Sequence, residues 1–389
     1  MVGNEQKGTY LGICIFFGAG MAAIFGPIFG SLTDKYGHRK IWIFIGVIFD
    51  CIGLFIMAIF PNVFIFIFGY FIAALSVTAS AAPFAGFIAD VVPKEKIGST
   101  SGILSSMGFF GTLFGSTFGF LISYSGDNSI GFSFLMIIMI IGMLITVLII
   151  PEKKLEKEKD EKTFIDYLKS FLDPFLKSND FRWTLISQFF FQLGIDSIRS
   201  FLQYYLRDTL KYPFKFIGIW SIKDEASAVS ILLIFIAISS LFTSIITGKL
   251  SEIFGIRGVF VNISGLYLAS FPLALLITKG YFHFYLIYSI LFGIGQGCYT
   301  AISWELAIKS VPENAKSNGQ SLALWQTTRI VATLISATIS GVIVDVFSKI
   351  GKDLLNINHF GYYIIFSMAI LNFFIGSIFV WMIKVARKK

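Results

Sequence analysis

Residues 30–40 read Gly-Ser-Leu-Thr-Asp-Lys-Tyr-Gly-His-Arg-Lys and separate two long apolar runs. Glycine has no Cβ atom, so Gly30 and Gly37 permit a tight turn and close backbone approach. Charged side chains of both signs lie around them, namely Asp34, Arg39 and Lys40. The stretch predicts a charged turn where one membrane helix ends and the next begins.

The composition is that of an integral membrane protein. Of the 389 residues, 56% are hydrophobic and only 14% are charged, which excludes an ordinary soluble domain. Apolar runs of about 20 residues recur along the chain, and each is long enough to cross a lipid bilayer as a helix. The net charge of +8 comes from residues in the loops, so we predict no nucleic-acid partner.

We predict eleven membrane-spanning helices and therefore an all-α, polytopic fold. They cover Gly8–Leu32, Ile41–Phe60, Val63–Ile88, Ser99–Tyr124, Phe132–Ile150, Phe181–Leu206, Ile231–Leu250, Val259–Thr278, Phe282–Ile308, Gln320–Val344 and Tyr362–Ile383. Residues 151–180 interleave Lys and Glu, which predicts a cytosolic linker. The linker separates an N-terminal bundle of five spans, residues 1–150, from a C-terminal bundle of six spans, residues 181–389.

The distribution of Lys and Arg indicates the orientation, because basic residues concentrate in cytosolic loops. Placing residues 30–40 in the cytosol puts most of the loop Lys and Arg on that side. The C-terminus, which ends in Arg387, Lys388 and Lys389, then faces the cytosol. The chain is predicted to be a multi-pass membrane protein with Met1 outside.

A degraded second copy of the opening stretch lies at Gly248–Gly258 and reads Gly-Lys-Leu-Ser-Glu-Ile-Phe-Gly-Ile-Arg-Gly. Two segments that end spans also correspond, Asp90–Pro93 and Lys309–Pro312. These matches indicate parallel repeats, which are known in transporters. At this spacing Phe181–Leu206 has no counterpart, so the first helix of a twelve-helix plan is missing. Either the gene model starts too late or the protein has eleven helices.

The opening stretch resembles the signature loop of the major facilitator superfamily (MFS), which runs Gly, x, Leu, x, Asp, two residues, Gly, x, Arg, Arg or Lys. The resemblance implies a two-bundle transporter that works by alternating access. It also implies a gating loop, made of Gly30, Asp34, Gly37, Arg39 and Lys40, with Asp90 as the partner of Arg39. The alternative is that these charges only fix topology and cap helix ends.

The sharpest set of candidate binding residues lies in the predicted span Phe181–Leu206. Five polar side chains recur there at intervals of three and four: Gln188, Gln192, Asp196, Arg199 and Gln203. That spacing places them on one helical face, and charges inside a bilayer normally face a bundle interior or a cavity. The MFS resemblance places this helix beside the central cavity, which predicts a solute-binding face. A structural ion pair between Asp196 and Arg199 is the alternative.

Two further polar residues share a face of the span Phe282–Ile308, Gln296 and Tyr299, with Ser303 one turn beyond them. Hydrogen bonds to a polar solute and helix packing are both open interpretations. In the span Ser99–Tyr124, glycines at spacing four predict close helix packing: Gly111, Gly115 and Gly119.

Asp50 and Arg329 each lie deep inside a predicted span. A carboxyl group in apolar surroundings binds a proton more readily than one in water. Asp50 can therefore pair with Arg329, carry a coupling proton or simply stay protonated. Asp196 is a second candidate for proton coupling, and Arg329 needs an acidic partner or a cavity.

We expect a secondary transporter of a small polar solute. The second half loosely resembles microbial MFS members related to sugar symporters, through Phe181-Arg182-Trp183, Gln203–Leu206 and Trp304, so a sugar moved with protons is one candidate. That subgroup usually has an acid where this chain has Ser303.

Two other functions stay open, a drug/proton antiporter and a non-transporting or truncated relic that acts as a sensor or partner protein. The Gly-Pro pair typical of MFS drug antiporters is replaced by Gly115-Ser116. The sequence shows no nucleophile and base pair, metal-ligand cluster or cofactor motif, so we predict no enzyme activity, no metal and no cofactor.

Overall fold

The structure is a computed structural model that describes residues 20, 25, 28–29, 39–60, 62–125, 128–149, 172–216, 220–278, 281–311, 318–357 and 359–387. Most of the predicted first span, Gly8–Leu32, lies outside these residues. So do Gly30, Asp34 and Gly37 of the predicted gating loop, and the side chains of Arg39 and Asp90.

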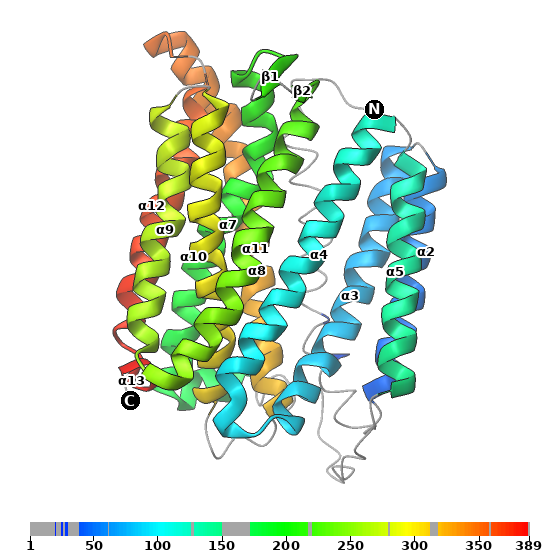
Figure 1. Cartoon of the computed structure of the whole chain (residues 1–389), viewed down its shortest axis with the longest axis vertical. Coiled ribbons are helices and arrows are strands. Elements are labelled where there is room, and N and C mark those ends of the chain that lie inside the picture. Colours follow the sequence, from blue (N-terminus) through cyan, green and yellow to red (C-terminus); the bar gives the residue numbers. More distant parts are fainter. Residues whose placement is uncertain are drawn as a thin grey trace. The chain divides into compact units, whose positions relative to one another are not determined.

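Long helices dominate the described chain (Figure 1). They are α2 (Arg39–Ile59), α3 (Val63–Val91), α4 (Ile97–Ser125), α5 (Asn128–Ile149), α7 (Asn179–Thr209), α8 (Glu225–Phe254), α9 (Arg257–Ile277), α10 (Phe282–Lys309), α11 (Asn318–Ile350) and α12 (Phe360–Val380). Shorter turns of helix are η1 (Lys94–Lys96), η2 (Gly351–Leu355), α13 (Lys384–Arg387) and residues 172–177. The all-helical, polytopic prediction is confirmed.

Among the described residues, eight helices are long and apolar enough to cross a membrane. They are α2, α3, α5 and the five helices from α8 to α12. The helix α7 is not among them, because its polar residues lower its mean hydropathy despite its 31 residues. Each predicted span from Ile41 onward coincides with one of the long helices, within a few residues at the ends.

A short antiparallel hairpin connects α7 to α8, which the sequence analysis did not anticipate. Its strands are β1 (Phe214–Phe216) and β2 (Trp220–Ile222), and Lys215 pairs with Ser221 at the centre. Strands of three residues are too short to show a clear alternation of polar and apolar residues. The hairpin is a small addition to an otherwise helical fold.

The described contacts divide the chain into two compact units. Unit 1 comprises residues 1–92, 128–185 and 307–334, and unit 2 comprises residues 93–127, 186–306 and 335–389. The helix α11 therefore contributes its first half to unit 1 and its second half to unit 2. The predicted bundle boundaries, 1–150, 151–180 and 181–389, stay a prediction.

In unit 1, α2 packs closely on α3 through small residues. A Cβ atom on Gly46 would lie 2.9 Å from the backbone oxygen of Ser76, and one on Gly53 would lie 2.7 Å from the backbone oxygen of Gly69. Contacts this short exclude larger side chains at the two glycines. Small residues on both helices therefore allow the close approach.

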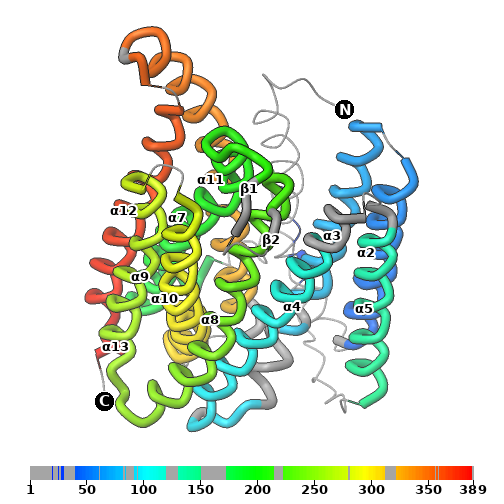
Figure 2. The backbone as a smooth tube through the Cα atoms, turned by 45° about the horizontal axis from the view of Figure 1, so that its top comes forward, coloured from blue at the N-terminus to red at the C-terminus, as the bar shows by residue number. Residues whose placement is uncertain are grey.

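In unit 2, the start of α4 lies beside the end of α8 (Figures 1 and 2). A Cβ on Gly102 would lie 2.6 Å from the backbone oxygen of Ser244, and one on Gly248 would lie 2.7 Å from that of Gly98. By contrast, no described atom lies within 4 Å of a Cβ built on Gly111 or Gly115. Within the described residues, the close approach of α4 thus occurs at its first turns and not at the predicted glycine stripe.

Candidate functional site

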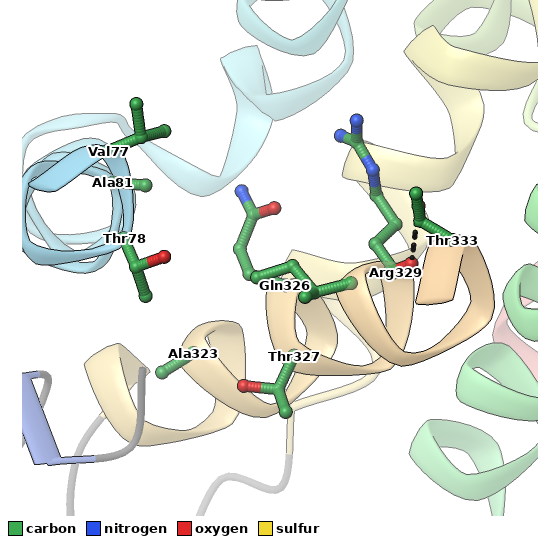
Figure 3. Close-up of a pocket in the computed structure, with 9 residues that line it drawn as sticks. Val77, Thr78, Ala81, Ala323, Gln326, Thr327, Arg329 and Thr333 are labelled. Atoms are coloured by element: carbon green, nitrogen blue, oxygen red, sulfur yellow. Dashed lines mark hydrogen bonds between the residues drawn. The ribbon is translucent and has the colours of Figure 1, made fainter. Parts of the chain in front are cut away.

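A cavity of about 210 Å³ lies in unit 1, between α3 and the first half of α11. Figure 3 shows the two helices with the lining side chains between them. The cavity is lined by Val77, Thr78, Ala81, Ala323, Gln326, Thr327, Arg329, Ile330 and Thr333. Arg329 is the one residue of this set that the sequence analysis singled out.

Helical periodicity explains how these residues share one space. On α3, Thr78 and Ala81 are three residues apart, and on α11 the lining residues recur at intervals of three and four. The Thr78 hydroxyl donates a hydrogen bond to the carbonyl oxygen of Ala74 at 2.8 Å. This bond satisfies the hydroxyl proton, while the oxygen retains accepting capacity. The small side chain of Ala81 leaves room on the α3 side of the cavity.

Among the described residues that line the cavity, Arg329 is the only ionised side chain, and it is half-buried. It makes no ion pair with any residue that the structure describes. In Figure 3 its guanidinium group and the carboxamide of Gln326 extend from the same side of α11, whereas Thr327 points away from them. A charged group within a membrane span is costly unless a partner or water compensates it. Arg329 makes this otherwise neutral lining electropositive.

Three of the five predicted residues on α7 are buried. Gln188, Gln192 and Asp196 are 2%, 8% and 7% exposed, whereas Arg199 and Gln203 are exposed. The Nε2 atom of Gln192 donates a hydrogen bond to Oδ2 of Asp196 at 2.8 Å. Asp196 therefore has a neutral hydrogen-bond donor one turn away on its own helix.

Two other faces of α7 are occupied by neighbouring helices. The Ser187 hydroxyl donates to the carbonyl oxygen of Gly376 on α12 at 2.9 Å, and Phe191 stacks near Phe373 of that helix. The Ser197 hydroxyl lies 2.9 Å from that of Ser336 on α11. By helical geometry, the polar residues from Gln188 to Gln203 occupy the remaining face, turned away from α11 and α12.

The predicted residues on α10 face α7. Tyr299 stacks on Phe191 of α7, with ring centroids 4.3 Å apart. Gln296 is one turn away on the same face, is 5% exposed, and its Oε1 accepts no hydrogen bond from a described residue. The chain reverses its direction at each of the three connections from α7 through α8 and α9 to α10, so α7 and α10 run antiparallel. Gln296 and Asp196 are consequently displaced toward the same end from the stacked rings.

The structure thus groups the predicted site residues in two places. The α7 and α10 residues belong to unit 2, where Tyr299 stacks on Phe191, and Arg329 lines the cavity in unit 1. Sequence reasoning missed Gln326, Thr327 and Thr333 beside Arg329. The available signal was spacing: Gln326, Arg329 and Thr333 lie three and four residues apart within an apolar span, and Thr327 is next to Gln326.

Asp50 is 4% exposed and lies on α2 between the two glycines that contact α3. The intervals 46, 50 and 53 place the three residues on one face, so Asp50 is turned toward α3. Asp50 and Arg329 both belong to unit 1, but the structure records no ion pair between them. Of the three interpretations, proton carrier and permanently protonated acid remain open.

The second copy of the signature stretch forms a buried ionic cluster in unit 2. The hydroxyl of Ser251 donates to Oε2 of Glu305 at 2.5 Å, and Nε of Arg257 donates to Oε1 at 2.6 Å. Gly255 ends α8 in the left-handed conformation, with φ of 68°, which favours glycine. That turn carries Arg257 back toward Glu305 of α10.

A second acid of the same copy contacts the first turn of α4. The backbone N–H of Ser99 donates a hydrogen bond to Oε1 of Glu252 at 2.6 Å. The N-terminal N–H groups of a helix have no partner within the helix and favour negative charge. Glu252 therefore holds the start of α4 to the end of α8, beside the glycine contacts of Gly102 and Gly248.

The described chain combines helices that are long and apolar enough to cross a membrane with a cavity lined partly by polar side chains. The sequence model of the Major Facilitator Superfamily matches residues 5–323, and the chain belongs to this family. The resemblance of residues 30–40 to the MFS signature thus indicated the correct family.

Curated relatives include the multi-drug resistance efflux pump PmrA of Streptococcus pneumoniae, 32% identical over 219 residues. That match covers 53% of this chain and 51% of the pump, so the chain spans about half the length of this relative. An uncharacterised MFS-type transporter of Methanocaldococcus jannaschii is 22% identical over 330 residues, 82% of this chain and 77% of the relative.

Solved structures share the fold at low sequence identity. The human organic anion transporter MFSD10 superposes with a TM-score of 0.69 at 13% identity, over 93% of this chain and 83% of that one. The proton:xylose symporter XylE gives a TM-score of 0.68 at 15% identity, over 98% and 87%. The MFS transporter FucP, in an outward conformation, gives 0.64 at 15% identity, over 98% and 91%.

Proposed function

We propose that this MFS transporter moves a small polar solute by alternating access, and that the cavity between α3 and α11 is part of the solute path. The observation that carries the proposal is the cavity itself. A cationic side chain, an amide and three hydroxyl groups line a space between two membrane helices. Polar groups at this depth are costly to bury without a partner. A polar solute and its water supply such partners.

The buried polar face of α7 and the facing residues of α10 form the second part of the proposed site. Gln188, Gln192 and Asp196 are buried yet polar, and Gln296 keeps an acceptor that no described residue uses. Buried polar groups are nearly always satisfied by hydrogen bonds. Gln296 is therefore a candidate to accept a hydrogen bond from a solute hydroxyl or a water molecule.

Proton coupling is part of the proposal, with Asp196 and Asp50 as candidate carriers. Asp196 has the stronger geometric support, because it lies on the polar face of α7 and accepts a hydrogen bond from the neutral donor Gln192. Asp50 lies in the α2–α3 contact. A sugar is one candidate solute, and its hydroxyl groups would match the glutamine side chains of α7.

Drug efflux is the second candidate function, favoured by the 32% identity with PmrA. Two features of the cavity oppose it. Drug-sized ligands occupy pockets of roughly 300–1,000 Å³, and this cavity has about 210 Å³. Arg329 would also repel a cationic drug, since none of the nine described lining residues is an acid.

We also propose that the C-terminus faces the cytosol, on the basis of the loop Lys and Arg residues. A single cysteine can test this orientation. A variant with Cys14, Cys51 and Cys298 replaced by Ser and a new cysteine added after Lys389 should react with a membrane-impermeant maleimide only after permeabilisation. Labelling of intact cells would reverse the proposed orientation.

Reconstitution tests the transport proposal. The purified full chain is incorporated into vesicles that contain a pH-sensitive dye, and glucose, xylose, lactate or ethidium is added outside. A symporter would carry protons inward with one of the first three solutes. Proton release driven by ethidium would instead support drug antiport. No flux with any member of the panel, from a correctly inserted protein, would remove the transport proposal and support the relic.

A further inference from the structure

Among the residues that the structure describes, the cavity between α3 and α11 is lined by one cation and by no acid. We infer that the transported solute carries an oxyanion, most simply a carboxylate, and that Arg329 binds this group. The inference rests on the proposed transport function and deepens it by naming the chemical class of solute.

The charge distribution is the first argument. Among the nine lining residues, Arg329 is the only ionised side chain, and it forms no ion pair with a described residue. Arginine stays protonated in proteins, so its charge is present at every physiological pH. An anionic solute would neutralise this charge on binding, whereas a cationic solute would face repulsion without compensation.

The hydrogen-bonding geometry is the second argument. The guanidinium group is a planar fork of N–H donors that matches the two oxygens of a carboxylate. The carboxamide of Gln326 extends from the same side of α11, as Figure 3 shows, and its NH₂ group supplies further donors. The Thr78 hydroxyl already donates to Ala74, so its oxygen is available mainly as an acceptor. Arg329 and Gln326 therefore both offer N–H donors on this side of α11.

The apolar lining residues indicate the size and polarity of the uncharged part of the solute. Apolar side chains line the cavity beside the polar ones: Val77, Ala81, Ala323 and Ile330. A volume of about 210 Å³ corresponds to roughly seven water molecules at about 30 Å³ each. The cavity thus suits a small organic anion with one charged end, and it is too small for a drug-sized molecule.

Paired ligands test the inference on the purified full chain in detergent. Thermal unfolding is measured with lactate, benzoate and glucuronate, and with the amides lactamide, benzamide and glucuronamide, at ionic strength matched by chloride. Each amide keeps the shape of its acid and lacks the charge. We expect at least one carboxylate to stabilise the protein at concentrations where its amide does not.

Three variants assign the effect to Arg329. In Arg329→Gln the stabilisation by the carboxylate should disappear. In Arg329→Lys, which keeps the charge and lacks the planar fork, the apparent affinity should fall by about tenfold, a loss of about 1.4 kcal/mol. Lys349→Gln removes one charge from the same helix at an exposed position outside the cavity, and it should bind as the unaltered protein does.

The outcomes separate this inference from the transport proposal. Equal stabilisation by acids and amides, equal stabilisation of the Arg329→Gln variant, or no effect of any carboxylate beyond chloride would each overturn the oxyanion assignment. If an amide or glucose is nevertheless carried by the reconstituted protein, the transport proposal stands. Should Arg329→Gln fail to give a monodisperse protein, the Arg329→Lys variant is used instead. An unchanged affinity for the carboxylate in that variant would overturn the assignment of Arg329.

Discussion

The Nε atom of Arg257 lies 2.6 Å from Oε1 of Glu305, a carboxylate that is 0% exposed. Arg257 opens α9 and belongs to the second copy of the signature stretch, whereas Glu305 lies near the end of α10. The pair therefore connects the loop between α8 and α9 to α10, which follows α9 in the chain. Glu305 is fully buried and Arg257 is 9% exposed, so the pair has little access to water.

Breaking this pair from one side should strongly destabilise the protein. Glu305→Gln leaves the Arg257 charge buried without its counter-charge, which typically costs about 3–5 kcal/mol. Thermal unfolding of the purified protein should show the loss, and the double variant Arg257→Met, Glu305→Leu should recover much of it. As a control, Asp173→Asn removes the partner of the exposed Lys177 and should change stability by at most about 1 kcal/mol. Equal effects of the two carboxylate variants would contradict a structural role for the buried pair.

Alanine at Gly102 should disturb the contact between α4 and α8. The new Cβ would lie 2.6 Å from the backbone oxygen of Ser244, so the helices must separate, and overpacking of this kind costs about 1–3 kcal/mol. Gly115→Ala on the same helix meets no described atom within 4 Å and should instead be neutral or slightly stabilising. Thermal unfolding and uptake rates of the two variants provide the comparison. If Gly102→Ala unfolds at the same temperature as Gly115→Ala, the close contact between α4 and α8 does not contribute to stability.

Asp196→Asn should abolish proton-coupled uptake while the protein still folds. The amide oxygen of Asn can accept the 2.8 Å hydrogen bond from Gln192, so the local structure is kept while the titrating group is lost. Proton flux and counterflow exchange of the solute, measured in the same vesicles, separate coupling from binding. The matched control is Asp353→Asn, an exposed acid in η2. Full proton coupling in the Asp196→Asn protein would remove Asp196 from this role and leave Asp50 as the candidate.

Tyr362→Phe should loosen the junction between α7 and α12. The Tyr362 hydroxyl donates to Oδ2 of Asp208 at 2.8 Å, and a hydrogen bond to a charged group is worth about 1.5–3 kcal/mol. Because Asp208 is partly exposed and also pairs with Arg207, we expect the lower end of this range. Tyr363→Phe, at the next position, serves as the control in thermal unfolding. Identical stabilities of the two phenylalanine variants would show that this bond contributes nothing.

Helix positions and polar faces were predictable from the sequence because they depend on local periodicity. An apolar run of about 20 residues can satisfy its backbone within the bilayer only as a helix. The spacing of Gln188, Gln192 and Asp196 placed them on one face of α7, and the structure shows all three buried. The same reasoning placed Gln296 and Tyr299 on one face of α10, where Tyr299 now stacks on Phe191.

Contacts between distant segments were not predictable from local patterns. The closest glycine contacts of α4 involve Gly98 and Gly102 and not Gly111 and Gly115, because a glycine stripe shows where a helix can be approached and not which helix approaches it. The hairpin of β1 and β2 was missed because three residues carry too little periodic signal.

The sequence by itself determined that this protein is a helical membrane protein of the MFS, since hydropathy, charge in loops and the glycine and arginine spacing of residues 30–40 are local properties. Only the tertiary structure decided that Arg329 shares a cavity with Thr78 and Gln326, and that Arg257 meets Glu305. The reason is physical: local order along the chain fixes which face a side chain occupies, but the packing of whole helices decides which faces meet.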